Sequence, residues 1–284
     1  MTLGDCLCGA LRYEVDGPFN LMMNCHCSMC RKHHGSAFAT FVGAALSGFR
    51  WISGAADIQT YPSSEHGQRY FCGVCGSVGP TLAPEMGLAV LPAGNLQGAL
   101  GIKPQAHMFV GSKASWYTIS DSLPQYQEYP PEFGATAVKR PQPPSTPGAA
   151  HGSCLCGDVA YGVQGAPLRM MNCYCSRCRR ARSAAHASNL FYQAEQFHWL
   201  RGESQVAEFK LPEAKYFATA FCTRCGGELP RVSKERGTAI VPAGSLDEHP
   251  GINTTAHIFV ASKADWVEIA DTTAPQFAQG PPPP

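Results

Sequence analysis

Fourteen cysteines are the residues of this chain best suited to chemistry, and their spacing repeats. Seven of them recur in the same order 148 or 150 residues further along the chain. Seven is an odd number, so disulfides within each set would leave one thiol over. The two cysteines of a Cys-x-Cys pair are also too close for an easy mutual bridge. The pattern therefore favours metal ligation over a disulfide framework.

Four cysteines of each set form two separated pairs and predict a structural metal site. These ligands are Cys6, Cys8, Cys72 and Cys75 in the first set, and Cys154, Cys156, Cys222 and Cys225 in the second. Four thiolates make the usual closed, tetrahedral zinc site. Thiolate sulfur also favours zinc over magnesium or calcium. Each site would tie the amino-terminal strand of its copy to the middle of that copy.

The other three cysteines of each set lie within six consecutive residues and predict an open metal site. They are Cys25, Cys27 and Cys30 in the first set, and Cys173, Cys175 and Cys178 in the second. Three thiolates cap one face of a metal and leave a fourth position for water or substrate, so all six are candidate catalytic residues. Two alternatives stay open. A distant side chain such as His107 could close the tetrahedron, or the thiols could stay free of metal.

The repeat extends well beyond the cysteines, so the chain is a tandem duplication. Met22-Met23-Asn24-Cys25 matches Met170-Met171-Asn172-Cys173, and Ser112-Lys113-Ala114 matches Ser262-Lys263-Ala264. The cysteine offset grows by two residues, which fits an insertion near Lys210-Leu211. A length of 284 residues also suggests two domains.

We assign the domains to residues 1–136 and 151–276, a proline-rich linker to 137–150, and a disordered tail to 277–284. Four prolines in seven residues, from Pro141 to Pro147, favour an extended spacer. No apolar run is long enough to span a membrane. The first residues lack the features of a signal peptide. We therefore expect a cytoplasmic protein without a membrane partner.

The elements that must position the cysteines read as mostly antiparallel β-strands. Leu11, Tyr13 and Val15 alternate with polar residues, as in a half-buried strand. Phe38–Val42 and Met108–Val110 are short runs of β-prone residues. The best candidate for a helical turn is Arg31–His34, directly after the three-cysteine cluster. The fold class is therefore mainly β.

Metal ligation changes the charge of the chain and the partner it predicts. The formal net charge is +1, and fourteen thiolates with four zinc ions would bring it to about −5. An acidic protein is a poor binder of nucleic acid, because such binding neutralises phosphates with lysine and arginine. Arg31 and Arg179 follow the two three-cysteine clusters directly. They are our candidates for contact with an anionic substrate or cofactor.

Four motifs together resemble the glutathione-dependent formaldehyde-activating enzyme family, which includes the CENP-V-like proteins. The motifs are Gly4-x-Cys6-x-Cys8-Gly9, Cys25-His26-Cys27-Ser28-x-Cys30-Arg31-Lys32, Phe71-Cys72-x2-Cys75-Gly76-Ser77 and His107-x-Phe109-Val110-x-Ser112-Lys113-x2-Trp116. The resemblance covers both copies and implies two tandem zinc-binding β-tent domains. It implies two zinc ions per domain: one in the four-cysteine site, and an exchangeable one in the three-cysteine site.

The resemblance also implies an activity. The named family member joins glutathione and formaldehyde to give S-hydroxymethylglutathione, so we expect a carbon–sulfur lyase acting in aldehyde detoxification. Its partners would be a small-molecule thiol and an aldehyde. The second copy departs from the family pattern where Gly227 replaces Ser77, Tyr174 replaces His26 and Arg182 replaces His34. These departures leave open whether both copies share one substrate.

Two other functions stay open on the sequence. The same three-cysteine site could serve a different zinc enzyme, an isomerase or hydrolase acting on a small electrophile or toxin. The domains could also be a zinc-stabilised binding module without chemistry. No acid–base pair stands out. His107 and His257 read as core residues or as hydrogen-bond partners of a ligand, His33 and His34 as weaker candidates, and Trp116 and Trp266 as core.

Overall fold

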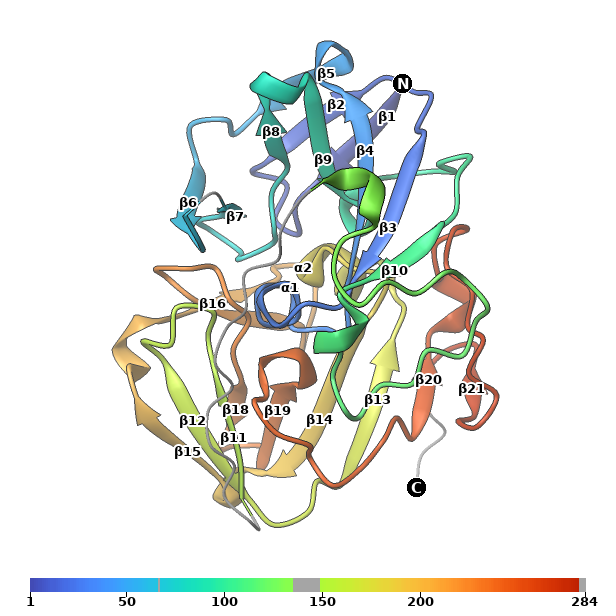
Figure 1. The fold of residues 1–284 in the computed structure, drawn as a ribbon. Helices are drawn as coiled ribbons and strands as arrows, with labels where there is room; N and C mark the ends of the chain where they lie inside the picture. The colour runs from blue at the N-terminus through green and yellow to red at the C-terminus, as the bar shows by residue number, and fades with distance from the viewer. Residues whose placement is uncertain (66, 135–148, 281–284) are drawn as a thin grey trace.

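We describe the protein from a computed structural model, which describes residues 1–65, 67–134 and 149–280 (Figure 1). Each copy of the repeat forms one β-rich domain, the first in the upper half of Figure 1 and the second in the lower half. Within the described residues, α-helix is confined to one seven-residue segment per copy. The prediction of a mainly β chain with two tandem domains is therefore confirmed.

The two domains follow the same order of elements, with the two α-helices in equivalent places. The first consists of β1 (Thr2–Asp5), β2 (Arg12–Val15), β3 (Leu21–Cys25), α1 (Ser28–His34), β4 (Ala39–Ala45), β5 (Phe49–Ser53), β6 (Ile58–Pro62), β7 (Gln68–Cys72), β8 (Thr81–Ala83), β9 (Leu88–Pro92) and β10 (Ala106–Met108). The second consists of β11 (Ala149–Ser153), β12 (Ala160–Gln164), β13 (Arg169–Cys173), α2 (Ser176–Arg182), β14 (Ala187–Gln193), β15 (Phe197–Arg201), β16 (Val206–Lys210), β17 (Ala218–Cys222), β18 (Arg231–Ser233), β19 (Thr238–Pro242), β20 (Ala256–Ile258) and β21 (Gln276–Phe277).

Three sheets recur in each domain. The first domain has the sheets β1-β2-β5, β10-β3-β4-β9-β8 and β6-β7, and the second has β11-β12-β15, β18-β19-β14-β13-β20-β21 and β16-β17. Neighbouring strands are antiparallel except at β10–β3, β20–β13 and β20–β21. The central strands β3 and β13 end at Cys25 and Cys173, so the largest sheet of each domain positions its three-cysteine cluster.

The predicted alternation in the second strand is only partly correct. Tyr13 and Val15 of β2 are buried as expected, but Glu14 between them is buried as well. Its carboxylate is paired with the guanidinium of Arg50 on the neighbouring strand β5. Burial of a charged side chain costs less free energy when an opposite charge pairs with it.

The two domains share one hydrophobic core. A single cluster of buried side chains includes Tyr13 and Leu91 of the first domain together with Tyr161 and Val241 of the second. Burial of apolar area is the dominant favourable contribution to folding, so this cluster couples the stability of the two domains. We therefore expect them to unfold as one unit.

Each short helix docks against the other domain. Helix α1 packs on the 3-10 turn η8 (Ala243–Ser245), and α2 packs on η3 (Ala93–Asn95). A Cβ atom on Gly94 would lie 2.3 Å from the backbone nitrogen of Ala184, and one on Gly244 would lie 2.4 Å from the carbonyl oxygen of Arg31. Only glycine permits such an approach.

Two ion pairs reinforce the contact between each helix and the other domain. Lys32 of α1 lies 2.6 Å from Asp247 in the second domain. Arg180 of α2 occupies the equivalent position and lies 3.1 Å from Asp5 in the first domain. Both pairs are largely buried, so water screens them less than it screens surface pairs.

The predicted two-residue insertion lies in a connection that contacts the other copy. Residues 211–217 connect β16 to β17, whereas the equivalent connection in the first domain, 63–67, is two residues shorter. Leu211 and Ala214 in the longer connection pack against Cys6 and Cys72 of the first domain. The second copy therefore covers the four-cysteine site of the first.

Two boundaries differ from the sequence expectation. Strand β10 stops at Met108, because Phe109 adopts a left-handed backbone with φ of 60° and begins the 3-10 turn η4 (Val110–Ser112). Most of the predicted linker, residues 137–148, lies outside the described residues, as do residues 281–284 of the predicted tail. Residues 277–280 are packed instead: Phe277 lies in β21, and the N–H of Phe259 donates to the carbonyl of Gln279.

Candidate functional site

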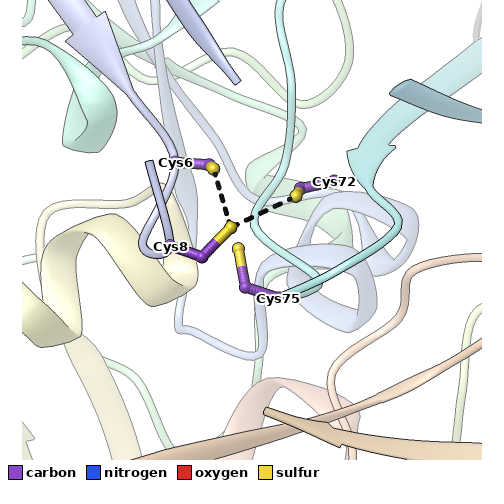
Figure 2. A group of neighbouring side chains, drawn as sticks. All are labelled: Cys6, Cys8, Cys72 and Cys75. Carbon is purple, nitrogen blue, oxygen red and sulfur yellow. Dashed lines mark hydrogen bonds between the residues drawn. The ribbon is translucent and has the colours of Figure 1, made fainter. Parts of the chain in front are cut away.

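The four cysteines of the first closed site converge as their spacing predicted (Figure 2). Cys6 and Cys8 follow β1, while Cys72 ends β7 and Cys75 lies in the turn after it. The Sγ atom of Cys8 lies 3.4 Å from that of Cys6 and 3.7 Å from that of Cys72. Four sulfurs each 2.3 Å from a central zinc would be about 3.8 Å apart. The donor set therefore fits a tetrahedral metal ion.

The second closed site repeats this geometry. The Sγ atom of Cys156 lies 3.3 Å from that of Cys154 and 3.8 Å from that of Cys222, and Cys225 completes the group. Three of the four side chains are fully buried. Buried, unpaired thiolates would be costly without a cation, which again fits a metal ion.

Each three-cysteine cluster is built by the start of a short helix. Cys27 is the N-cap of α1, and its Sγ accepts the backbone N–H of Cys30 at 3.3 Å. Cys175 is the N-cap of α2 and accepts the N–H of Cys178 at 3.4 Å. A capping side chain normally satisfies an N–H of the first turn. The Cys-x2-Cys spacing thus makes the turn that brings the sulfurs together.

The clusters contain three ligands and no fourth. All sulfurs of each cluster lie within 4.8 Å of one another, and no other cysteine, histidine, aspartate or glutamate of the described ranges joins them. Cys25, Cys27 and Cys30 are all buried, whereas Cys175 of the second cluster is half-buried. The clusters can therefore hold a metal from one side, and that of the second copy is the more accessible.

The electrostatics of the clusters favour a thiolate at the capping position. Hydrogen bonds from Cys173 and Cys178 lower the pKa of Cys175 to about 3, with backbone N–H groups adding to the effect. Hydrogen bonds from Cys25 and Cys30 lower the pKa of Cys27 well below its usual value in the same way. A thiolate is the form that binds metals.

A residue missed in the sequence lies against the first cluster. The guanidinium of Arg69, on β7, is 3.5 Å from the Sγ of Cys30. The neighbouring thiolates overcome the effect of burial and hold its pKa above the usual value. The second copy has Thr219 at this position, and its hydroxyl donates instead to the carbonyl of Cys75 in the first domain. In the sequence, only the comparison of the two copies at β7 and β17 could have indicated that the clusters differ at this position.

The two arginines predicted to contact an anion both lie close to the clusters, but they differ in their exposure to solvent. Arg31 is buried, and the cysteines of its cluster partly offset the lowering of its pKa by burial. Arg179 is half-buried in the second copy; burial lowers its pKa, and the charge of Cys175 partly offsets this lowering. The Nε atoms of both have no partner within the described residues.

His33 and His34 lie in the interior, and His34 contacts the second domain. Both are completely buried. The Nδ1 atom of His34 lies 2.8 Å from the carbonyl oxygen of Arg182 in the second domain. Burial lowers the pKa of His34 to about 4 and that of His33 well below its usual value. Neither histidine joins the three cysteines.

The two equivalent histidines each form a buried hydrogen-bonded chain. His107 lies 2.8 Å from His26 through one ring nitrogen and 3.1 Å from Asp121 through the other. Both nitrogens are thus engaged, so His107 does not close the metal site.

His257 has the same arrangement in the second copy. Its Nδ1 lies 3.0 Å from the hydroxyl of Tyr174, and its Nε2 lies 3.1 Å from Asp271. Trp116 and Trp266 are buried in the core as expected, and Lys113 and Lys263 are exposed.

Comparison with known proteins agrees with the repeat. A family model described as glutathione-dependent formaldehyde-activating enzyme matches residues 1–112 and, a second time, residues 149–262. The chain is also similar to the crystal structure of a Rhodobacter sphaeroides protein, at 27% identity over 34% of this chain and 89% of that one, with a TM-score of 0.28. No curated protein matches it. Within the described residues, no helix is both long and apolar enough to cross a membrane.

Proposed function

This chain belongs to the glutathione-dependent formaldehyde-activating enzyme family, and from that premise we propose that it is a zinc-dependent carbon–sulfur lyase-type enzyme. Its substrate would be a thiol–aldehyde pair, with glutathione as the thiol. Addition of the thiol forms one C–S bond and moves the thiol proton to the carbonyl oxygen. The reverse reaction breaks that bond, and neither direction needs an oxidant.

One observation carries the proposal: each three-cysteine cluster converges without a fourth ligand from the described chain. A zinc ion held there would deprotonate a bound thiol or polarise a carbonyl oxygen. The closed four-cysteine sites have no such free position and would be structural. The four clusters together would hold four zinc ions, two in each domain.

The residues of the chain would do the binding and the charge compensation. Arg69 lies against the first cluster and offsets the charge of its sulfurs. Arg179 borders the second cluster and would contact a carboxylate of glutathione, as would Arg31 in the first. Holding two reactants in one orientation supplies most of the acceleration for an addition that is already easy in water.

The exchange of glutathione and formaldehyde with their adduct tests this function. NMR exchange spectroscopy should show a rate above the spontaneous one for the zinc-loaded chain. Cys175→Ser should remove most of the enhancement because its cluster is the more accessible, and Cys27→Ser should remove less. The double variant should return to the spontaneous rate.

Metal content separates the alternatives. Wild-type protein with four zinc ions per chain and no acceleration would contradict the proposal and leave a zinc-stabilised binding module. Ser176→Ala, which changes an exposed residue beside the cluster without removing a ligand, is the matched control and should keep the wild-type rate.

A further inference from the structure

A cavity of about 150 Å³ lies between the two domains, and its lining includes no cysteine of the described residues. The first domain contributes Phe38, Trp116, Tyr117, Thr118, Ser120 and Asp121. The second contributes residues of three segments, 172–186, 253–257 and 267–273. A cavity of this size in another protein is large enough for benzene. We call it the interdomain pocket.

The two walls of the interdomain pocket differ although the copies are equivalent in sequence. Phe38 on the first domain is the counterpart of His186 on the second, and the two rings are 5.5 Å apart. His26, behind the first wall, is the counterpart of Tyr174, which lines the pocket. At these two pairs of equivalent positions, the pocket is thus lined by a phenylalanine of the first domain and by a histidine and a tyrosine of the second. Neither domain could form the pocket alone.

The charge of the pocket is negative. Three acidic residues line it, Asp121, Glu268 and Asp271, and no lysine or arginine of the described chain does. Lys103 approaches only Glu268, at 3.9 Å, and both side chains are largely exposed.

Each of the two aspartates also contacts a histidine. Nε2 of His257 lies 3.1 Å from Asp271, and its Nδ1 lies 3.0 Å from the hydroxyl of Tyr174. His107 is placed in the same way between His26 and Asp121. The side chains of Asp121 and Asp271 are 31% and 27% exposed, so both carboxylates are accessible to a ligand that carries a positive charge.

One buried side chain at the wall has a polar atom without a partner. Asn172 is 2% exposed, and its Oδ1 has no hydrogen-bond partner within the described residues. Unsatisfied buried polar groups are rare in native proteins and call for an explanation. A ligand in the pocket would provide the missing partner.

We propose that the interdomain pocket binds a small organic cation, an ammonium compound of roughly benzene's size. Its positive charge would face Asp121 and Asp271, and its alkyl groups would pack against the rings of Phe38, Trp116 and Tyr117. Aromatic faces and carboxylates together are the groups that recognise ammonium ions in proteins. This site does not depend on the thiol–aldehyde chemistry proposed above.

The experiment compares two probes of the same shape on the full, zinc-loaded chain. Choline carries a trimethylammonium group, and 3,3-dimethyl-1-butanol is its uncharged isostere. Isothermal titration calorimetry should show saturable binding of choline with an affinity at least tenfold higher than that of the alcohol. Equal affinities would overturn the proposal, as would an absence of saturable choline binding.

Variants place the binding in this pocket. Asp271→Asn and Asp121→Asn should each weaken choline binding about tenfold, whereas Glu85→Gln, which removes an exposed carboxylate elsewhere in the first domain, should not change it. Thr118→Trp fills the pocket from an exposed position, so it tests the site even where an aspartate variant fails to fold. Unchanged choline binding in Thr118→Trp would overturn the proposal.

Discussion

The two copies of the repeat are alike at their closed four-cysteine sites and differ around their open three-cysteine clusters. Both four-cysteine sites have the same ligands and nearly the same sulfur–sulfur distances. The three-cysteine clusters have the same ligands but different neighbours, Arg69 in one copy and Thr219 in the other. The four-cysteine geometry is therefore the same in both copies, whereas the surroundings of the three-cysteine clusters differ.

Loss of a closed site should have the largest effect, and the effect should be the same in either copy. Cys72→Ser and Cys222→Ser each remove one of four metal ligands. A structural zinc contributes about 10 kcal/mol or more, which is comparable with the whole stability of a domain. Because the core is shared, we expect each variant to unfold both domains, as judged by circular dichroism.

The control for this prediction is Cys27→Ser, which leaves both closed sites intact and should keep the native spectrum. A Cys222→Ser chain in which only the second domain unfolds, detected as protection of the first in hydrogen exchange, would show that the domains are independent.

Acid should destabilise the protein mainly through histidines of the first copy. Burial lowers the pKa of His26 to about 3 and that of His34 to about 4, and lowers that of His33 as well. In the second copy the pKa of His186 is lowered in the same way, to about 3. Folding needs these groups neutral, so their contribution is complete above pH 6.5 and is lost as the pH falls toward 4.

The size of this effect can be measured at one residue. Each such histidine should lower the free energy of unfolding by about 2 kcal/mol when the pH falls from 7 to 5. His33→Ala introduces the residue of the second copy, Ala181, and should reduce the loss of unfolding free energy between pH 7 and pH 5 by about 2 kcal/mol in urea denaturation. His198→Ala changes an exposed histidine and should leave the pH dependence as it is. Equal pH dependence in both variants would contradict the prediction.

The cysteine sites could be predicted from sequence because ligand spacing is local chemistry. Cys27 and Cys30 belong to one helical turn, and Cys72 and Cys75 to one turn after a strand, so the ligands within each motif are brought together locally. Because the chain is a tandem duplication, each cysteine motif occurs twice, and its spacing could be compared between the copies. The helix after the three-cysteine cluster was expected for the same reason, although it begins at Ser28 rather than Arg31.

The features that depend on long-range approach could not be predicted. Arg69 on β7 contacts Cys30 across 39 residues of sequence, and nothing near Arg69 in sequence indicates this. Glu14 is buried because Arg50 lies on the next strand. The interdomain pocket combines residues of both copies that lie far apart in the sequence.

Arg69→Thr should make the open cluster of the first copy resemble that of the second. A hydrogen bond from a charged donor contributes about 1.5–3 kcal/mol, so metal affinity at Cys25, Cys27 and Cys30 should fall tenfold or more. Competition with a chromophoric chelator measures this affinity. The cluster of the second copy should be unaffected.

Arg12→Thr is the matched control, since it removes an exposed arginine of the same domain. An equal loss of affinity in Arg12→Thr would show that net charge, rather than the contact with Cys30, determines metal binding at this cluster.

The smallest expected difference lies beside the closed sites. Ser77 is buried, and its Oγ accepts the backbone N–H of Leu7 at 3.1 Å, a contact that Gly227 cannot make in the second copy. Ser77→Ala leaves this N–H without its partner and should destabilise the protein by about 1 kcal/mol in urea denaturation. Gly227→Ala should also destabilise, for the opposite reason, because its Cβ would lie 2.8 Å from the nitrogen of Leu155. A stabilised Gly227→Ala would contradict this prediction, because it would show that the second closed site accommodates a Cβ atom as the first does.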